Sequence, residues 1–236
     1  MSNRTNTSNE RQLNGAAARR LQRCLSRRIE RSGSPDTVAL VAGADCAFPD
    51  RGRRLRAAAV LMDWPRLSTV AEAVAEEPVR FPYIPGLLSF RELPGVRQAL
   101  ARLPSTPDLV LCDGQGIAHP RRLGIAAHLG AVTGWCTIGV GKSRLTGTHE
   151  TPGPDKGDRS PLLDAEERIG TVLRTRTRVR PLFVSPGHRI GHEAAAAWVL
   201  ACCGRYRLPE PIRAADRLAG TATGAAGKPV TGASPP

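Results

Sequence analysis

Two aspartates stand in apolar segments that we expect to form buried strands. Asp45 interrupts the segment VAGADCAF, and Asp113 closes the segment LVLCD just before a glycine. A buried carboxylate is costly unless it is paired or bound to a metal ion, and neither segment contains a basic residue. If both strands end at the same edge of one sheet, the two carboxylates form a site that suits Mg²⁺ or Mn²⁺. The alternative is that each aspartate caps a helix or pairs with an arginine, and spacing alone leaves both interpretations open.

Three other patterns of reactive residues carry less weight. The segment GVGKS at 139–143 is similar to a phosphate-binding loop, but that motif requires a glycine at position 136, which is a cysteine. Lys142 remains a candidate contact to phosphate or water at the end of a strand. Ser185 and His188 are too close in sequence for a catalytic triad, and the chain has no nucleophile elbow. Zinc-ligand spacing is missing from the group Cys112, His119, His128 and Cys136.

The segment FPYIPGLLSFRE at 81–92 combines apolar residues with features that break regular structure. Pro82, Pro85 and Gly86 exclude a regular strand or the first turn of a helix there. Tyr83, one of only two tyrosines in the chain, lies at the tip of this segment. We therefore expect a stiff loop that presents Tyr83 and leads into a helix.

The periodicity of apolar residues predicts the elements that position these side chains. Buried strands are expected at 37–48, 53–64, 107–114 and 135–143. Helices are expected at 15–32, 87–102, 121–134, 192–204 and 210–220. The alternation at 67–76 fits a strand or a helix, whereas we expect a loop at 146–162 and a hairpin at 169–187. This order of elements predicts an α/β domain with a mixed sheet.

Both ends of the chain differ from this core in composition. Residues 1–14 are polar, and residues 221–236 are rich in Gly, Ala, Thr and Pro. Such segments bury too little apolar surface to offset the entropy that folding costs. We therefore expect disordered ends around one folded domain at 15–220.

The chain is strongly basic, with 34 Lys and Arg against 21 Asp and Glu, which is a net charge of +13. Residues 1–36 contribute part of this excess through eight arginines against three acidic residues, and +8 remains in the rest of the chain. A charge balance of this kind favours a polyanionic partner, most simply nucleic acid.

Composition also indicates a compartment. The sequence contains no run of eighteen apolar residues, so we expect no membrane-spanning helix and no membrane partner. The first residues, MSNRTNTSNERQ, lack the apolar segment of a secretory signal. The six cysteines include no C-x-x-C pair and no disulfide framework. We expect a reduced, cytoplasmic protein.

Five segments together resemble the endonuclease V family, the inosine-directed nucleases. They are VAGADCAF, PYIPGLLSFRE, LVLCDGQGIAHPRRLGIAAHLG, TIGVGKSRL, and a C-terminal series made of IGTVLRTR, LFVSPGHR and RLPEPIRAAD. The match spans roughly residues 38–218. The resemblance implies an RNase H-like fold, in which a mixed five-stranded central sheet is flanked by helices and carboxylates converge on Mg²⁺.

The family's metal-binding acids match four positions, which are Asp45, Glu92, Asp113 and Asp216. Members of the family carry Asp or His at the last of these positions. Lys142 matches the lysine near the attacking water and the scissile phosphate. The resemblance therefore implies that these five residues are catalytic.

The resemblance also implies a set of residues that bind the substrate. Tyr83 matches the wedge that enters the duplex where the lesion base is turned out. His119 matches a histidine of the active-site region. Backbone around Ile84–Leu88 and Gly114–Gly116 is expected to line the base pocket, and the substrate-binding positions there are Ile84, Gly86, Leu88 and Gly116.

The activity implied is that of a Mg²⁺-dependent enzyme, with Mn²⁺ as a substitute, that recognises deoxyinosine in DNA during repair. It would hydrolyse the second phosphodiester bond 3′ to the lesion and leave 3′-hydroxyl and 5′-phosphate ends, and we expect a monomer. Two alternatives stay open: an endonuclease whose main substrate is inosine-containing RNA, and a non-catalytic nucleic-acid-binding protein. The complete set of acids and the lysine argues against the second alternative.

The sequence departs from the common family pattern in small ways. In GVGKS we expect Gly141 to loosen the strand end that carries Lys142. The Arg-rich N-terminal region and the Gly/Pro-rich tail lie outside the family core, and we assign them no function beyond nonspecific contact to phosphate.

Overall fold

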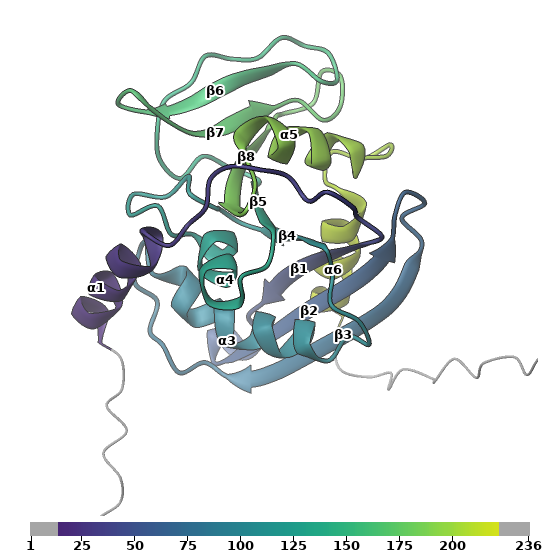
Figure 1. Ribbon diagram of the computed structural model, residues 1–236. Coiled ribbons are helices and arrows are strands. Elements are labelled where there is room, and N and C mark those ends of the chain that lie inside the picture. The colour runs from purple at the N-terminus through teal and green to yellow at the C-terminus, as the bar shows by residue number, and fades with distance from the viewer. Residues whose placement is uncertain (1–13, 222–236) are drawn as a thin grey trace, which may run out of the picture.

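The structure, a computed structural model, describes residues 14–221 and has a twisted sheet at its centre (Figure 1). Eight strands lie side by side in the order β3-β2-β1-β4-β5-β8-β7-β6. Their bounds are β1 Leu40–Ala47, β2 Arg54–Asp63, β3 Thr69–Pro78, β4 Leu109–Asp113, β5 Thr137–Gly141, β6 Arg159–Asp164, β7 Glu167–Leu173 and β8 Leu182–His188.

The sheet is mixed, as expected, but it is wider than the five strands that the resemblance implied. Strands β1, β4 and β5 are parallel to one another, and the remaining neighbours pair antiparallel. The five strands β3-β2-β1-β4-β5 form one continuous part of the sheet, and β8, β7 and β6 extend it beyond β5. Parallel neighbours bring their carboxyl ends to the same edge, which is where Asp45 and Asp113 lie.

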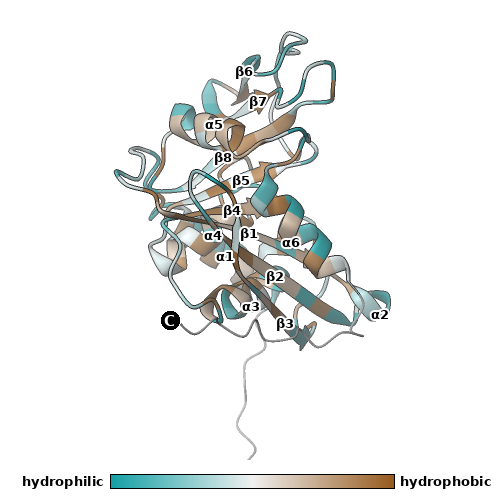
Figure 2. Ribbon diagram, turned by 90° about the vertical axis from the view of Figure 1, so that its right-hand side faces the viewer, coloured by the Kyte–Doolittle hydropathy of each residue, from teal (hydrophilic) through white to brown (hydrophobic). Residues whose placement is uncertain are grey.

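Helices cover both faces of the sheet (Figures 1 and 2). Helices α3 and α4 pack on one face with α1 outside α4, while α5 and α6 pack on the other. Apolar residues concentrate along the central strands, as the brown colour in Figure 2 shows. The bounds of the helices are α1 Gly15–Ser26, α2 Pro49–Gly52, α3 Leu88–Ala101, α4 Ile125–Thr133, α5 His192–Ala201 and α6 Glu210–Gly220. None of the described helices is long and apolar enough to cross a bilayer.

The two-residue period of a strand decides which layer each side chain of β1 and β4 meets. Ala42, Ala44 and Cys112 pack in the layer of α3 and α4, whereas Val41 and Leu111 pack in the layer of α5 and α6. The aspartates that follow Ala44 and Cys112 therefore point toward the layer that contains α6.

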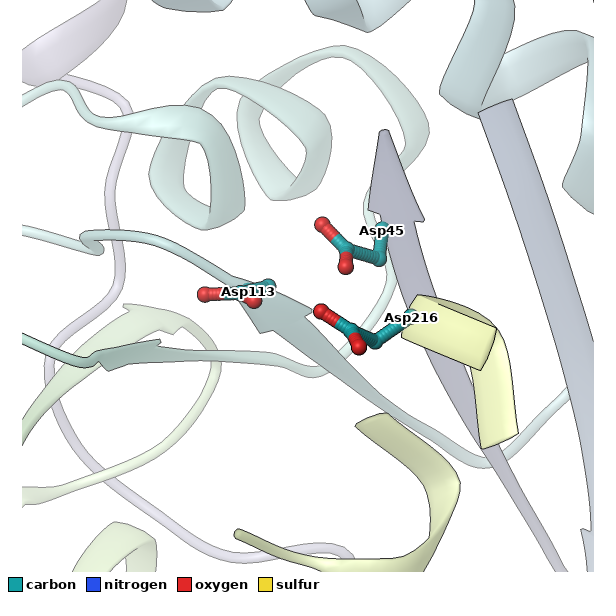
Figure 3. Close-up of side chains that lie close together, drawn as sticks. All are labelled: Asp45, Asp113 and Asp216. Carbon is teal, nitrogen blue, oxygen red and sulfur yellow. The ribbon is translucent and has the colours of Figure 1, made fainter. Parts of the chain in front are cut away.

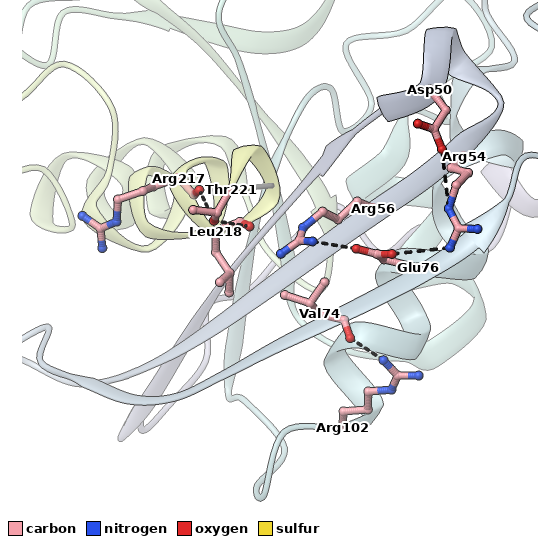
Figure 4. A network of polar contacts seen from close by, with 9 residues as sticks. All are labelled: Asp50, Arg54, Arg56, Val74, Glu76, Arg102, Arg217, Leu218 and Thr221. Carbon is pink, nitrogen blue, oxygen red and sulfur yellow. Dashed lines mark hydrogen bonds and ion pairs between the residues drawn. The ribbon is translucent and has the colours of Figure 1, made fainter. Parts of the chain in front are cut away.

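The outer strands β2 and β3 carry charges that protect the edge of the sheet (Figure 4). Arg56 faces Glu76 across the two strands, with Nη1 of the arginine 2.6 Å from Oε1 of the glutamate. Arg54 adds a second contact to Glu76 at 3.4 Å. Arg102, at the end of α3, donates to the backbone oxygen of Val74 in β3. Charged side chains and a covering helix are common means by which proteins prevent pairing of an edge strand with another chain.

Several boundaries differ from those that the periodicity predicts. Residues 67–76, which fitted a strand or a helix, form most of β3, because they pair with β2 along nearly its whole length. The first helix ends at Ser26 rather than at residue 32, and β6 begins within the expected loop 146–162. The expected pairing within 169–187 is confirmed by β7 and β8. The disorder expected at the two ends concerns residues that lie outside the described range, apart from Asn14, which caps α1, and Thr221.

Candidate active site

Asp45 and Asp113 lie at the carboxyl ends of the neighbouring parallel strands β1 and β4. The register pairs Ala44 with Cys112, so the two aspartates follow at adjacent positions on the same face. The amide of Cys46 donates to Oδ1 of Asp45 at 2.7 Å, which holds that carboxylate at the strand end. Both segments are therefore strands, as expected, and their two acids meet at one edge of the sheet, an arrangement that spacing alone had left open.

Helix α6 brings a third carboxylate, Asp216, to this point (Figure 3). One oxygen each of Asp45, Asp113 and Asp216 lies within 4.8 Å of the others. The helix can approach this closely because residue 43 in β1 is a glycine: a Cβ there would overlap the backbone oxygen of Pro211 in the first turn of α6. Gly43 thus sets the distance between the strand and the helix that carry two of the three acids.

Glu92 approaches the same acids from the opposite layer, because it belongs to α3. It shares a small cavity of about 10 Å³ with Asp45 and Asp113, close to the space that one water molecule needs. Burial, followed by the nearby charges of Asp45 and Asp113, raises the pKa of Glu92 to about 8. Glu92 is therefore not one of the three clustered aspartates, but it lies close enough for the charges of Asp45 and Asp113 to affect its pKa.

The electrostatics of the cluster favour a cation. Burial, and then repulsion from Asp113, raise the pKa of Asp45 to about 7. Burial also raises the pKa of Asp113, although Lys142 opposes this change. Asp216 is more exposed, and its hydrogen bond from Lys142 lowers its pKa. Within residues 14–221, Lys142 is the basic residue that forms ion pairs with this group of four carboxylates, and a divalent cation among them would stabilise their charged forms.

Lys142 follows β5 and points at this cluster. Its Nζ lies 2.5 Å from Oδ2 of Asp113 and 3.0 Å from Oδ1 of Asp216. Burial lowers the pKa of the lysine, but these contacts together outweigh burial and raise the pKa, so the ammonium form persists across the neutral range.

Two side chains that the sequence did not single out hold the backbone on which Lys142 stands. Arg207 donates to the backbone oxygen of Lys142 at 2.8 Å, and Gln115 donates to that of Ser143 at 3.0 Å. A Cβ at Gly141 would overlap the amide group of Gln115. The expectation that Gly141 loosens this strand end is therefore wrong, since the missing side chain makes room for the contact that holds it.

A second cavity, of about 250 Å³, adjoins the carboxylates. The loop 83–86 and Leu88 line one side, the Gly114–Gln115 backbone and His119 line another, and Glu92 and Asp113 connect it to the acid cluster. Tyr83 stands at its rim with 68% of its surface exposed. The structure thus gathers most of the expected substrate-binding residues around one cavity.

Gly116 is the member of the expected set that does not line this cavity. It is buried, its amide donates to Oγ of Ser185 at 2.8 Å, and a Cβ there would overlap the backbone oxygen of Pro186. Gly116 therefore serves close packing between the strand-end loop and β8. Gly114 and Gln115 occupy the wall of the cavity instead.

His119 holds the loop that carries Tyr83. Its Nδ1 accepts a hydrogen bond from the amide of Arg121 at 3.1 Å, so Nε2 carries the proton and donates to the backbone oxygen of Gly86 at 3.1 Å. Burial, followed by the charge of Arg121, lowers the pKa of His119 to about 4. The imidazole is therefore neutral at pH 7, and it positions Gly86 rather than carrying charge.

Comparison with known proteins agrees with this geometry. The endonuclease V family model matches residues 23–217. A protein of Alkalilimnicola ehrlichii named endonuclease V is 60% identical over 211 residues, which cover 88% of this chain and 92% of that protein.

Solved structures give the same result. The crystal structure of endonuclease V from Streptomyces avermitilis is 45% identical, with a TM-score of 0.84 and coverage of 87% of this chain and 91% of that one. The Ciona intestinalis endonuclease V, solved with a 24mer DNA containing an inosine followed by a ribo-adenosine, is 28% identical, with a TM-score of 0.75 and coverage of 86% and 95%. These similarities confirm the RNase H-like fold. The chain is a nuclease, and hence a hydrolase, that belongs to the endonuclease V family.

Proposed function

We propose that this chain is a Mg²⁺-dependent endonuclease that recognises deoxyinosine in DNA and acts in DNA repair. It hydrolyses the second phosphodiester bond 3′ to the lesion and leaves 3′-hydroxyl and 5′-phosphate ends, with residues 15–220 as its monomeric catalytic domain. The observation that supports this most strongly is the meeting of Asp45, Asp113 and Asp216 beside a cavity whose rim carries Tyr83.

The acid cluster fits a hard divalent cation. Its donors are carboxylate oxygens, which Mg²⁺ prefers and Mn²⁺ accepts. The three aspartates lie within one ligand shell of each other, and the small cavity between Asp45, Asp113 and Glu92 offers space beside them. We assign Asp45, Asp113, Asp216 and Glu92 as the ligands. When bound, the ion activates a water molecule and neutralises charge on the leaving oxygen.

Lys142 supplies a fixed positive charge at the same place. Its ammonium group has three donors, and the contacts to Asp113 and Asp216 leave capacity for a phosphate oxygen or the attacking water. Because Arg207 and Gln115 hold the adjoining backbone, the lysine needs little reorganisation when the substrate arrives. Its role is to orient the reacting groups and to stabilise charge that develops in the transition state.

The loop with Tyr83 allows the enzyme to distinguish a damaged base from normal bases. Turning a base out of the duplex costs a few kcal/mol, and least for a base that pairs poorly, as hypoxanthine does. An aromatic ring that stacks in the gap returns about 1–3 kcal/mol. Pro82 and Pro85 restrict the loop before binding, so that less entropy is lost when Tyr83 inserts. The extruded base then enters the cavity between Gly86, Leu88 and Gly114.

The complex of the Ciona intestinalis relative with inosine-containing DNA supports this choice of substrate. The ribo-adenosine that follows the inosine in that complex also supports a second candidate, an endonuclease that acts on inosine-containing RNA. The large positive charge of this chain suits the phosphate backbone of DNA and of RNA equally.

Matched oligonucleotides test the proposal. DNA and RNA strands of one sequence, each with a single inosine or an adenine in its place, are incubated with the protein and Mg²⁺ or with EDTA. We expect cleavage of the inosine-containing DNA with Mg²⁺ and none with EDTA. Faster cleavage of the RNA strand would favour the second candidate, and equal cleavage of inosine and adenine strands would exclude recognition of the lesion.

A further inference from the structure

Two consecutive arginines in the loop after β4 differ sharply in their partners. Arg122 forms ion pairs with Asp164 at 2.8 Å and with Glu167 at 2.7 Å. Arg121 forms no ion pair with any carboxylate of residues 14–221, and its guanidinium donates only to neutral acceptors. The charge of Arg122 is therefore neutralised by two carboxylates within the fold, whereas the charge of Arg121 remains available to bind an anion.

The neutral acceptors of Arg121 fix its guanidinium beside the base cavity. Its Nη2 donates to the backbone oxygen of Gly86 at 2.6 Å, and its Nε donates to Oε1 of Gln22. Gln22 belongs to α1, is fully buried, and donates through Nε2 to the oxygens of Gly86 at 2.9 Å and Leu123 at 3.2 Å. Helix α1 is thus attached to the loop that lines the cavity, although the sequence placed it outside the family core.

The attachment of α1 determines where its arginines lie. Ala18, Gln22 and Leu25 form the buried side of the helix, so Arg19 and Arg23, four residues apart, share a face next to that side. Nη1 of Arg19 and Cδ1 of Ile84 both lie within 4 Å of the position that a Cβ on Gly15 would take.

Because Gln22 accepts a hydrogen bond from Arg121, its helix neighbours Arg19 and Arg23, three residues before and one residue after it, lie near the same guanidinium. Burial, and then the charges of Arg19 and Arg23, lower the pKa of Arg121. Within the described part of the chain neither Arg19 nor Arg23 forms an ion pair with a carboxylate. Three like charges thus gather at the edge of the cavity without a compensating acid.

We propose that Arg19, Arg23 and Arg121 bind one backbone phosphate next to the nucleotide whose base enters the cavity. Guanidinium groups present paired donors that match phosphate oxygens, and a bound anion would relieve the repulsion among the three cations. The site rests on the proposed function, because the loop 84–86 is placed against the extruded base. Helix α1 contributes to this site in two ways, since Gln22 orients Arg121 and Arg19 and Arg23 complete the set of donors.

Binding without cleavage tests the proposal. In EDTA, affinities for a duplex with one inosine are measured for the wild type, for Arg19→Ala/Arg23→Ala, and for Arg20→Ala/Arg27→Ala. The last variant is the control: it also removes two positive charges, but from Arg20 on α1 and from Arg27 at its C-cap, both of which are exposed. We expect Arg19→Ala/Arg23→Ala to weaken binding about tenfold more than the control, since a charge-assisted hydrogen bond contributes at least that much, and to lower the salt dependence by about one ion.

Replacing single phosphates by neutral methylphosphonates on either side of the inosine identifies the contact. One position should weaken binding of the wild type and of the control clearly more than binding of Arg19→Ala/Arg23→Ala, in which only Arg121 still contacts that phosphate. If every position weakens all three proteins equally, or if both double variants lose the same affinity, the site does not exist. A wild type that binds inosine and adenine duplexes equally would instead overturn the proposed function, which keeps the two failures distinct.

Discussion

The Nζ atom of Lys142 lies 2.5 Å from Oδ2 of Asp113, so the end of β4 and the end of β5 are joined by an ion pair. The same nitrogen reaches Asp216 on α6 at 3.0 Å. One cation therefore holds carboxylates from a strand and from a helix in a single cluster. It forms ion pairs with two of the four acids, so a divalent ion bound among them would stabilise the charged forms of the other two.

Replacing Lys142 by methionine should preserve the fold and reduce cleavage about 10²–10³-fold, the typical cost of removing one preorganised donor in an active site. Single-turnover cleavage of an inosine-containing duplex measures this effect. Lys156→Met is the matched control, since the ammonium of Lys156 donates to the backbone of Cys203 instead. Equal rates for the two variants would show that Lys142 is structural only.

Replacing Gly43 by alanine should push α6 away from β1. The added Cβ would overlap the backbone of Pro211, and overpacking of this kind costs about 1–3 kcal/mol. Because Asp216 moves with the helix, the affinity for Mg²⁺ should fall together with the urea midpoint. Gly220→Ala, at the other end of α6, places its Cβ in open space and serves as the control. An unchanged Mg²⁺ titration in Gly43→Ala would contradict the role of this close approach.

Replacing Tyr83 by alanine should change specificity more than stability. The side chain is largely exposed, so its removal should alter the free energy of unfolding by less than about 0.5 kcal/mol. Loss of stacking should reduce the preference for inosine over adenine duplexes by about tenfold or more. Val132→Ala, an exposed apolar residue of α4, is the control. Equal loss of affinity for both duplexes would mean that Tyr83 does not act as a wedge.

His128 should contribute a loss of stability in mild acid, opposite in sign to the contributions of Asp45 and Glu92, whose pKa values are raised. His128 is 3% exposed, its Nδ1 lies 3.1 Å from Oγ of Ser89, and burial lowers its pKa from 6.5 to about 4. The unfolded chain therefore takes up the proton first as the pH falls below 6.5. The resulting loss grows down to about pH 4, where it saturates near roughly 3 kcal/mol.

Urea unfolding between pH 4 and pH 8 checks this expectation. The variant His128→Gln keeps a polar partner for Ser89 but cannot titrate, so between pH 8 and pH 4 its stability should gain on that of the wild type by up to roughly 3 kcal/mol. Parallel curves for the two proteins would show that His128 does not contribute to the acid sensitivity.

The sequence predicted the parts of the site that depend on local pattern. The apolar runs around Asp45 and Asp113 identified both strands. The carboxylates within these runs indicated a functional site, since a buried acid needs a partner. Glu92 and Asp216 came from family resemblance alone, because each lies on a helix whose own pattern does not reveal what it faces.

Other features depend on contacts between distant segments. Residues 69–78 became a strand through pairing with β2, which periodicity could not settle. Gln22 meets Gly86 across 64 positions, and Arg207 meets Lys142 across 65. No local pattern encodes such contacts, since they arise only when the helices dock on the sheet.

The most direct test maps the cut that we attribute to this acid cluster. A DNA duplex with one deoxyinosine is incubated with Mg²⁺ and either the wild type or Asp45→Asn, and the product ends are identified by mass. We expect the wild type to cut the second phosphodiester bond 3′ to the inosine, leaving 3′-hydroxyl and 5′-phosphate ends, and Asp45→Asn to leave the strand intact. An intact strand with the wild type, a cut elsewhere, or equal cleavage by both proteins would contradict the assignment of Asp45 and its neighbours as the catalytic centre.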